Sequence, residues 1–141
     1  LTVVTSPAEA DIAILRVETP SERLHPHHFF GSRQNEGRLD FRDGDPDYEA
    51  IKKASAAVPT IVSVNLDRPA ILTNVRDKAT VLLATFGASD GAVLDVLMGK
   101  AKAEGRLPFN LPRSMEAVVK QDPAQSDDDA NPLYEQNYRV D

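Results

Sequence analysis

A strand, a tight turn and a helix follow one another within residues 79–100, and this succession restricts the fold more than any other feature of the chain. The apolar run over residues 81–86 ends at Gly87, which is typical of a buried strand. Ser89 follows the turn and is suited to cap a helix, whose apolar positions recur through residues 93–97. A buried strand that leads into an amphipathic helix is the building unit of a parallel α/β sheet.

The same alternation recurs earlier in the chain. Runs rich in Ile and Val at residues 12–17 and 59–66 predict two more buried strands. Between them, Pro46 is suited to the first turn of a helix with apolar residues at helical spacing. We therefore expect an α/β fold with a mostly parallel sheet sandwiched between helices on both faces.

Less regular segments complete the expected architecture. Residues 71–81 are expected to carry a short helix or an irregular connection, and residues 114–120 a final helix capped by Ser114. The acidic residues 122–130 predict a solvated loop. Short additional strands are predicted at residues 2–4, 107–109 and 134–140.

Composition excludes several classes of protein. The 141 residues suffice for one domain with one core, and the net charge of −6 argues against nucleic-acid binding, which favours a basic surface. No apolar run approaches the about 18 residues of a membrane-spanning helix. Cysteine is absent, which excludes disulfide and thiolate chemistry and leaves the compartment open, periplasmic and secreted included. Because the chain begins at Leu1 rather than Met, we expect it to be a piece of a longer protein.

The long polar loop at residues 18–45 is the best place to look for chemistry. In open α/β sheets, ligands bind beyond the carboxyl ends of strands, and loops of this length are often functional. Besides arginines and histidines, the loop carries several carboxylates, among them Glu18, Glu22, Glu36 and Asp40. From the residues alone two interpretations stay open. The loop presents a carboxylic acid to a ligand bound elsewhere, or its charges simply keep it solvated.

The histidine-rich stretch of this loop does not have the pattern of a metal site. Pro26 interrupts the run of His25, His27 and His28, and no carboxylate or cysteine stands at a standard ligand spacing. The glycine-containing turn at residues 87–91 lacks the dinucleotide and P-loop patterns. We predict neither a metal nor a cofactor.

Six motifs in one order carry a resemblance to a known family. They are ADIAILRVETP at residues 10–20, GRLDF at 37–41, VPTIV at 58–62, NLDRPA at 65–70, GASDGAVLDVLMGKAKAEGRLPFNLPRSMEAV at 87–118 and NPLY at 131–134. In this order they resemble the C-terminal domain of family 3 glycoside hydrolases, the β-glucosidase and exo-glycosidase group. The motifs cover nearly the whole chain.

The resemblance implies a function for the intact protein. Residues 1–141 would be the C-terminal, flavodoxin-like layered domain of a retaining β-glycosidase, similar to a β-glucosidase, that hydrolyses terminal non-reducing β-linked sugars. The family's nucleophile is an Asp from an N-terminal barrel domain, which this chain lacks. The carbohydrate substrate would be shared with that barrel. The isolated chain is therefore expected to be inactive, although the full-length protein would be an O-glycosyl hydrolase.

The same resemblance narrows the candidate catalytic residues to two. In the family, the loop after this strand supplies the general acid/base, a Glu, so Glu22 and Glu18 are the candidates here. Glu22 is preferred, because Glu18 stands close to the end of the strand and is suited to anchoring it. The exposed apolar residues expected to contact the barrel are Leu24, Phe29 and Phe30. Substrate-binding residues and the oligomeric state are left open.

The end of the chain departs from the family pattern, and one alternative function stays open. The family usually ends in NPLYPFGYGL, whereas here Asn137 and Arg139 replace its two glycines, so a less ordered or differently paired terminal strand is expected. The alternative function is a non-catalytic, flavodoxin-like binding or interaction module. A barrel encoded upstream of Leu1 would distinguish the two.

Overall fold

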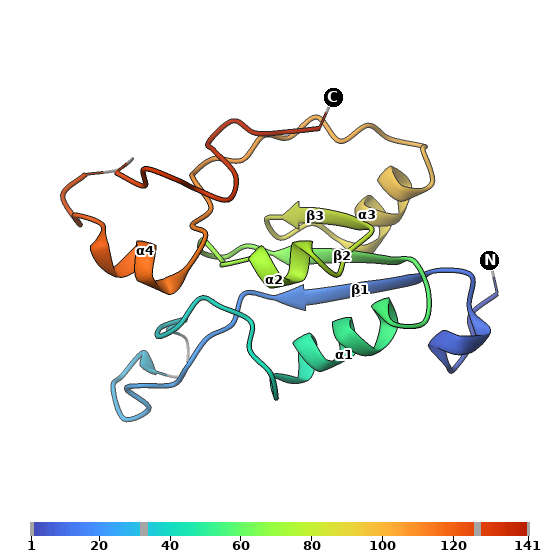
Figure 1. Ribbon diagram of the computed structural model, residues 1–141, viewed down its shortest axis with the longest axis horizontal. Coiled ribbons are helices and arrows are strands. Elements are labelled where there is room, and N and C mark those ends of the chain that lie inside the picture. Colours follow the sequence, from blue (N-terminus) through green and yellow to red (C-terminus); the bar gives the residue numbers. More distant parts are fainter. Residues whose placement is uncertain (1, 32–33, 126–127, 141) are drawn as a thin grey trace.

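The computed structural model of the protein describes residues 2–31, 34–125 and 128–140 (Figure 1). Residues 126–127 of the predicted acidic loop and residues 32–33 of the long polar loop lie outside the described residues. Strands and helices alternate as expected. In chain order they are a short 3-10 helix at Pro7–Glu9, β1 (Ala13–Glu18), α1 (Pro46–Ser55), β2 (Thr60–Asn65), α2 (Thr73–Arg76), β3 (Val81–Thr85), α3 (Asp90–Leu97) and α4 (Met115–Lys120).

The three main strands form one parallel sheet in the order β1-β2-β3. The predicted strands at residues 12–17, 59–66 and 81–86 are confirmed to within one residue at each end. In the register, Val62 of the central strand lies between Leu15 of β1 and Leu82 of β3. Both neighbours of β2 run parallel to it, so their carboxyl ends meet at one edge of the sheet, where the long loop begins.

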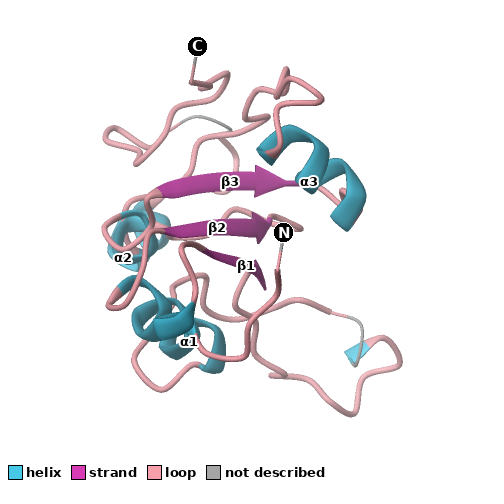
Figure 2. Cartoon of the chain, turned by 90° about the vertical axis from the view of Figure 1, so that its right-hand side faces the viewer, coloured by secondary structure: helices cyan, strands magenta, loops and turns pink. Residues whose placement is uncertain are grey.

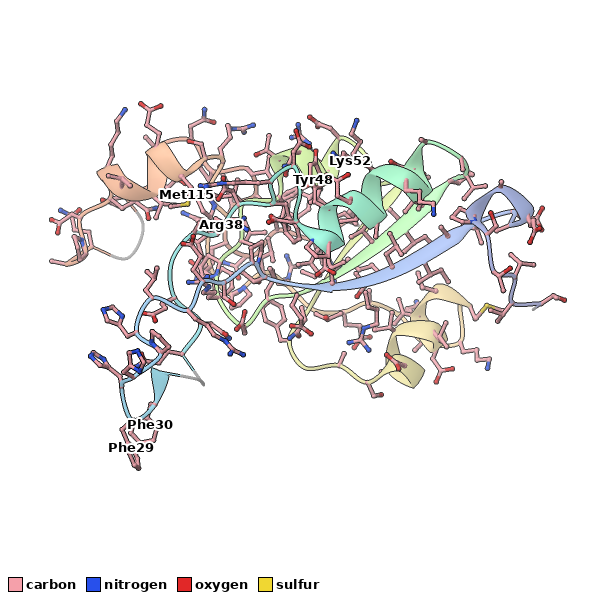
Figure 3. All side chains as sticks on the ribbon, turned by 90° about the horizontal axis from the view of Figure 1, so that it is seen from below. Phe29, Phe30, Arg38, Tyr48, Lys52 and Met115 are labelled. Carbon is pink, nitrogen blue, oxygen red and sulfur yellow. The ribbon has the colours of Figure 1, made fainter. Side chains whose placement is uncertain are left out.

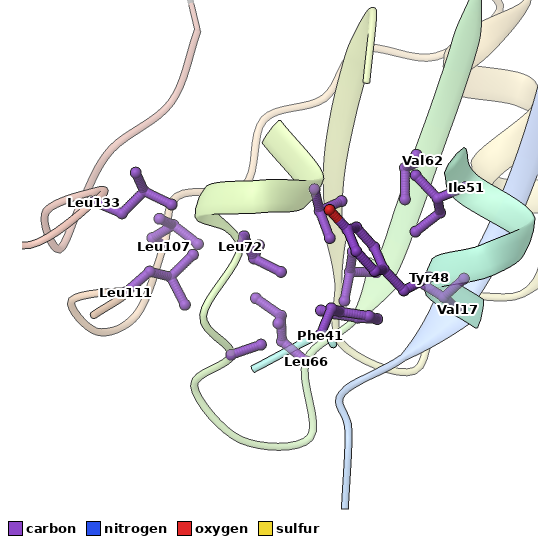
Figure 4. Close-up of a cluster of buried hydrophobic side chains, with 13 residues drawn as sticks. Val17, Phe41, Tyr48, Ile51, Val62, Leu66, Leu72, Leu107, Leu111 and Leu133 are labelled. Carbon is purple, nitrogen blue, oxygen red and sulfur yellow. The ribbon is translucent and has the colours of Figure 1, made fainter. Parts of the chain in front are cut away.

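The core lies between one face of the sheet and α1 (Figure 4). Tyr48, Ile51 and Ala54 of α1 are buried, as their spacing predicts. They meet the face of the sheet that carries Val17 and Val62. Leucines from the segments after β2 and after α3 extend this core beyond the sheet, at Leu66, Leu72, Leu107 and Leu111.

The opposite face of the sheet is covered less completely than expected. Arg16 of β1 alternates with the core-facing residues and donates to the carbonyl oxygen of Ala88 at 2.8 Å, which places the start of α3 on this face. Figure 2 shows α1 and α3 on different sides of the strands. Ile14 and Val81 nevertheless stay 42% and 41% exposed, so full burial is confirmed for β2 alone. The reason is that β1 and β3 are both edge strands, and α3, at eight residues, is too short to cover both.

The additional strands predicted outside the main sheet are wrong. Residues 2–4 and 107–109 are not strands, and residues 134–140 form only an isolated bridge, between Tyr134 and Leu111. The partner segment, residues 107–111, contains Pro108 and is followed by Pro112. Neither proline has an N–H to donate, so a continuous ladder cannot form there. Asn137 adopts a positive φ of 66°, which turns the chain out of an extended conformation.

The predicted helix caps are confirmed. The Ser89 side chain accepts a hydrogen bond from the N–H of Ala92 at the start of α3. Ser114 accepts in the same way from the N–H of Ala117 at the start of α4. Each helix in the described part of the chain is too short or too polar to span a membrane.

Candidate functional site

The long loop after β1 divides into two parts. We call residues 18–23 and 36–45 the loop base, and residues 24–31 the loop tip. In the base, the two passes of the chain meet in an antiparallel bridge, where the N–H of Glu22 donates to the carbonyl oxygen of Glu36 at 2.8 Å. The N–H of Thr19 donates to the carbonyl oxygen of Asn65 at 3.2 Å, which continues the pairing of β1 with β2 by one residue. Glu22 therefore lies just beyond the carboxyl edge of the sheet.

Arg68 fastens the two passes of the loop base to the turn after β2. Its Nη2 donates to the carbonyl oxygens of Pro20 at 2.5 Å, Arg38 at 2.8 Å and Glu36 at 3.0 Å. Its Nη1 lies 3.4 Å from the carbonyl oxygen of Gly37. The segment that Arg68 anchors is the one that carries Glu22.

The Glu22 carboxylate sits against the backbone of the returning pass. Its Oε2 accepts from the N–H of Arg38 at 2.9 Å, and the Arg38 Nε lies 4.0 Å from Oε1. Gly37 has a φ of +78°, and a Cβ there would lie 2.2 Å from Oε2, so this position requires glycine. The Glu22 side chain is 41% exposed, which leaves part of the carboxylate open to solvent.

A second ion pair holds the Arg38 guanidinium on its other side. Nη1 and Nη2 of Arg38 lie 2.8 and 2.5 Å from the two carboxylate oxygens of Asp45, a bidentate contact. The N–H of Arg42 donates to the same carboxylate at 2.7 Å. The hydrogen bond from Arg38 lowers the pKa of Asp45, and the same bond raises the pKa of Arg38. Neither residue was singled out from the sequence, because Asp45 before a proline has the pattern of an ordinary helix start.

Glu18 lies at the same edge of the sheet but has a different environment. It is the last residue of β1, and its Oε2 accepts from the Asn65 side chain at 2.8 Å. The Asn65 Oδ1 accepts in turn from the N–H of Gly87 at 2.9 Å, so Glu18 belongs to a hydrogen-bonded series across the three strand ends. Glu18 also borders a shallow hollow of about 230 Å³, which Ser21 and Arg38 line with it.

Two further carboxylates of the loop, Glu36 and Asp40, are paired with basic side chains. The hydrogen bond from the His25 ring at 2.7 Å is the main cause that lowers the pKa of Glu36, and Glu36 also accepts from the N–H of His25 at 2.8 Å. Asp40 accepts from the Nε of Arg42 at 2.8 Å. A carboxyl group with a lowered pKa is poorly suited to hold a proton, so Glu36 is a weak candidate for a general acid.

The loop tip projects away from the molecule (Figure 3). Phe29 is 92% and Phe30 58% exposed, and the two rings contact each other edge to face with centroids 4.7 Å apart. His25 and His28 stack at 4.8 Å. Within the described part of the chain, no three His, Asp or Glu side chains gather as metal ligands would. The exposure expected of the apolar residues of this loop, Leu24 included, is confirmed.

Comparison with known proteins agrees with the motifs. The family model described as "Glycosyl hydrolase family 3 C-terminal domain" matches residues 2–141. The chain is 51% identical over 136 residues to a periplasmic beta-glucosidase/beta-xylosidase of Dickeya chrysanthemi, covering 96% of this chain and 21% of that protein. It is 40% identical over 133 residues to a probable beta-glucosidase C of Aspergillus oryzae, covering 94% and 20%. The third relative, the beta-glucosidase C of Emericella nidulans, is 39% identical over 138 residues, covering 94% and 21%.

The chain therefore spans about a fifth of the length of these relatives. No solved structure matches it closely enough to count as a relative.

Proposed function

This chain belongs to the C-terminal domain family of the family 3 glycosyl hydrolases, and from that premise we propose that it supplies a general acid/base, Glu22, to a β-glycosidase active site. A barrel domain elsewhere in the same protein completes the site and provides the nucleophile. The substrates are terminal, non-reducing β-linked sugars of the β-glucoside class. The relatives are named as β-glucosidases and are about five times as long as this chain. Both facts support this proposal.

The chemistry explains why two domains share the work. A retaining glycosidase needs two carboxyl groups about 5–5.5 Å apart, one to attack the anomeric carbon and one to protonate the leaving oxygen. The first of these comes from the barrel in this proposal. The second comes from the loop base, which stands at the carboxyl edge of the sheet, where α/β proteins bind ligands.

The contacts of Glu22 carry the choice of this residue. One carboxylate oxygen, Oε2, is fixed by the Arg38 N–H at 2.9 Å, while the nearest cation stands 4.0 Å from the other. A carboxyl group held by one oxygen can present the other to a glycosidic oxygen. Glu18 is less suited, because its carboxylate takes part in the hydrogen bonds that join the strand ends.

A general acid must also keep its proton until the substrate is bound. In the isolated chain Glu22 is 41% exposed, so water stabilises its charged form. A barrel docked over the loop base would remove this water and bring the negative charge of the nucleophile close, and both changes favour the protonated acid. We accordingly expect the isolated chain to fold without hydrolysing aryl β-glucosides.

The test is a leaving-group series on the full-length protein. Glu22→Gln should lower kcat/KM about 100-fold or more for aryl glycosides with poor leaving groups, because protonation of the leaving oxygen is lost. Activated aryl glycosides need little protonation and should be affected far less. Glu18→Gln is the matched control and should show no such dependence. If only Glu18→Gln shows it, the roles are reversed. If neither does, the alternative of a non-catalytic module gains support.

A further inference from the structure

The charged residues next to Glu22 suggest how its proton is kept in place. We propose that Asp45 is a positioning residue that acts through Arg38: it holds the guanidinium away from Glu22, so that Glu22 keeps its proton to a higher pH. This inference rests on the proposed role of Glu22 as the general acid.

The first observation is the unusual use of Asp45. It is the N-cap residue of α1, with an extended backbone at φ −70° and ψ 128°, yet its side chain makes no capping hydrogen bond. An Asp at this position ordinarily accepts from an N–H of the first helical turn, which stabilises the helix. Here both carboxylate oxygens accept from Arg38 instead. The Asp45 side chain therefore does not cap α1 and instead pairs with the Arg38 guanidinium.

The second observation is the direction in which Arg38 is held. Its two terminal nitrogens contact Asp45 at 2.5 and 2.8 Å, and Nη1 also donates to the carbonyl oxygen of Asp40 at 2.5 Å. Only Nε faces Glu22, at 4.0 Å. The side chains of Arg38 and Asp45 are 17% and 22% exposed, so solvent screens their attraction less than that of a surface pair.

Three other charged side chains near Glu22 have partners of their own. The Arg68 guanidinium donates to backbone carbonyls, and Glu36 accepts from His25. Arg42 pairs with Asp40. Among these groups Arg38 is the cation that lies 4.0 Å from Glu22 and is held closely by a second carboxylate, that of Asp45. The pKa of Arg38 is raised by Asp45 first and by the charge of Glu22 last, which agrees with Asp45 as its principal partner.

The expected consequence of removing the Asp45 charge follows from electrostatics. The Arg38 guanidinium would turn to the nearest remaining carboxylate, and an opposite charge at close range favours the ionised form of Glu22. Glu22 would then lose its proton at a lower pH. For a general acid, this shifts the alkaline limb of the kcat/KM profile to lower pH.

The experiment measures this limb on the full-length protein, with an aryl β-glucoside that has a poor leaving group. Asp45→Asn should move the limb down by about 1 pH unit. Asparagine is as good an N-cap as aspartate, so α1 should be retained. Arg38→Gln should move the limb up, because it removes the cation. In the Arg38→Gln background, Asp45→Asn should have no further effect.

Asp43→Asn is the matched control. It removes the same charge two positions away, from a side chain that is 84% exposed and pairs with Lys52, and should leave the limb unmoved. An unmoved limb in Asp45→Asn, or a shift that persists without Arg38, would overturn the inference. Glu22→Gln in the same assay separates the two proposals. If it lacks leaving-group dependence, the role of Glu22 is wrong. If it shows that dependence while Asp45→Asn leaves the limb unmoved, only the inference about Asp45 fails.

Discussion

The base and the tip of the long loop belong to one stretch of sequence but are held in different ways. The base is bonded to the body of the protein by Arg68, by the bridge between Asp40 and Ile71 and by Phe41, which is 3% exposed. The tip bonds mainly to itself and to Glu36, and Phe29 at its end is 92% exposed. Figure 3 shows the two phenylalanines of the tip far from Arg38.

The difference indicates that the loop base and the loop tip have separate roles. A carboxylate that must meet a glycosidic oxygen needs a fixed position, since a displacement of about 1 Å lowers catalysis severely. Apolar side chains that meet another domain need only be available, and a pair of exposed aromatic rings is suited to that. We therefore expect changes in the base to alter stability, and changes in the tip to leave the isolated chain unaffected.

The largest expected effect compares two phenylalanines. Phe41→Ala should lower the free energy of unfolding by about 4 kcal/mol, because it empties a buried site in the core. Phe29→Ala should change it by less than about 0.5 kcal/mol, because the ring is already in water. Urea denaturation of the isolated chain measures both values. Equal losses would show that the tip is part of the folded core.

The next effect concerns the anchor of the loop base. Arg68→Ala removes hydrogen bonds to three carbonyls and should destabilise the chain by about 3 kcal/mol. Hydrogen exchange should speed up at the N–H of Glu22. Arg106→Ala is the control, since this exposed arginine donates to one carbonyl, that of Asn137. If the N–H of Glu22 stays protected from hydrogen exchange in Arg68→Ala, the anchoring role of Arg68 is wrong.

A smaller effect separates backbone strain from the contact with Glu22. Gly37 and Gly44 both have positive φ, at 78° and 91°, but an added Cβ meets Glu22 only at Gly37. Gly44→Ala should cost about 1 kcal/mol of strain. Gly37→Ala should cost about 2 kcal/mol, because the same strain is joined by displacement of the carboxylate. Chemical denaturation gives the difference, and equal costs would mean that the Glu22 side chain moves aside freely.

The smallest effect is the pH dependence of the loop tip. His25 lowers the pKa of Glu36 from its ordinary value of 4.5. The stabilisation of the loop tip by Glu36 is therefore complete above pH 4.5 and is lost as the pH falls through the lower, folded-state pKa. Hydrogen exchange at the N–H of His25, relative to the intrinsic rate, should increase on acidification below 4.5. Glu36→Gln should remove most of this dependence. The N–H of Glu22, which bonds to a backbone carbonyl, serves as the internal control.

Much of the fold could be predicted from local sequence patterns, and the errors have a common cause. The helix caps at Ser89 and Ser114 depend on residues three positions apart, so the sequence displays them directly. Whether Ile14 and Val81 are covered depends on which elements pack over a whole face of the sheet. The prediction of a terminal strand was wrong for the same reason. That strand would have to pair with residues 107–111, a segment that is distant in the sequence and contains a proline.

The sequence by itself determined the alternation of strands and helices, the family and the loop in which to look for a catalytic acid. These rest on periodicity, capping and contiguous motifs, all of which act over a few residues. Tertiary structure alone decided how that loop is built. Arg68 bonds to the carbonyl of Pro20 across 48 positions, and Asp45 gives its carboxylate to Arg38 rather than to its own helix. Such choices depend on which donors and acceptors the fold brings within about 3 Å, a distance that sequence separation does not reveal.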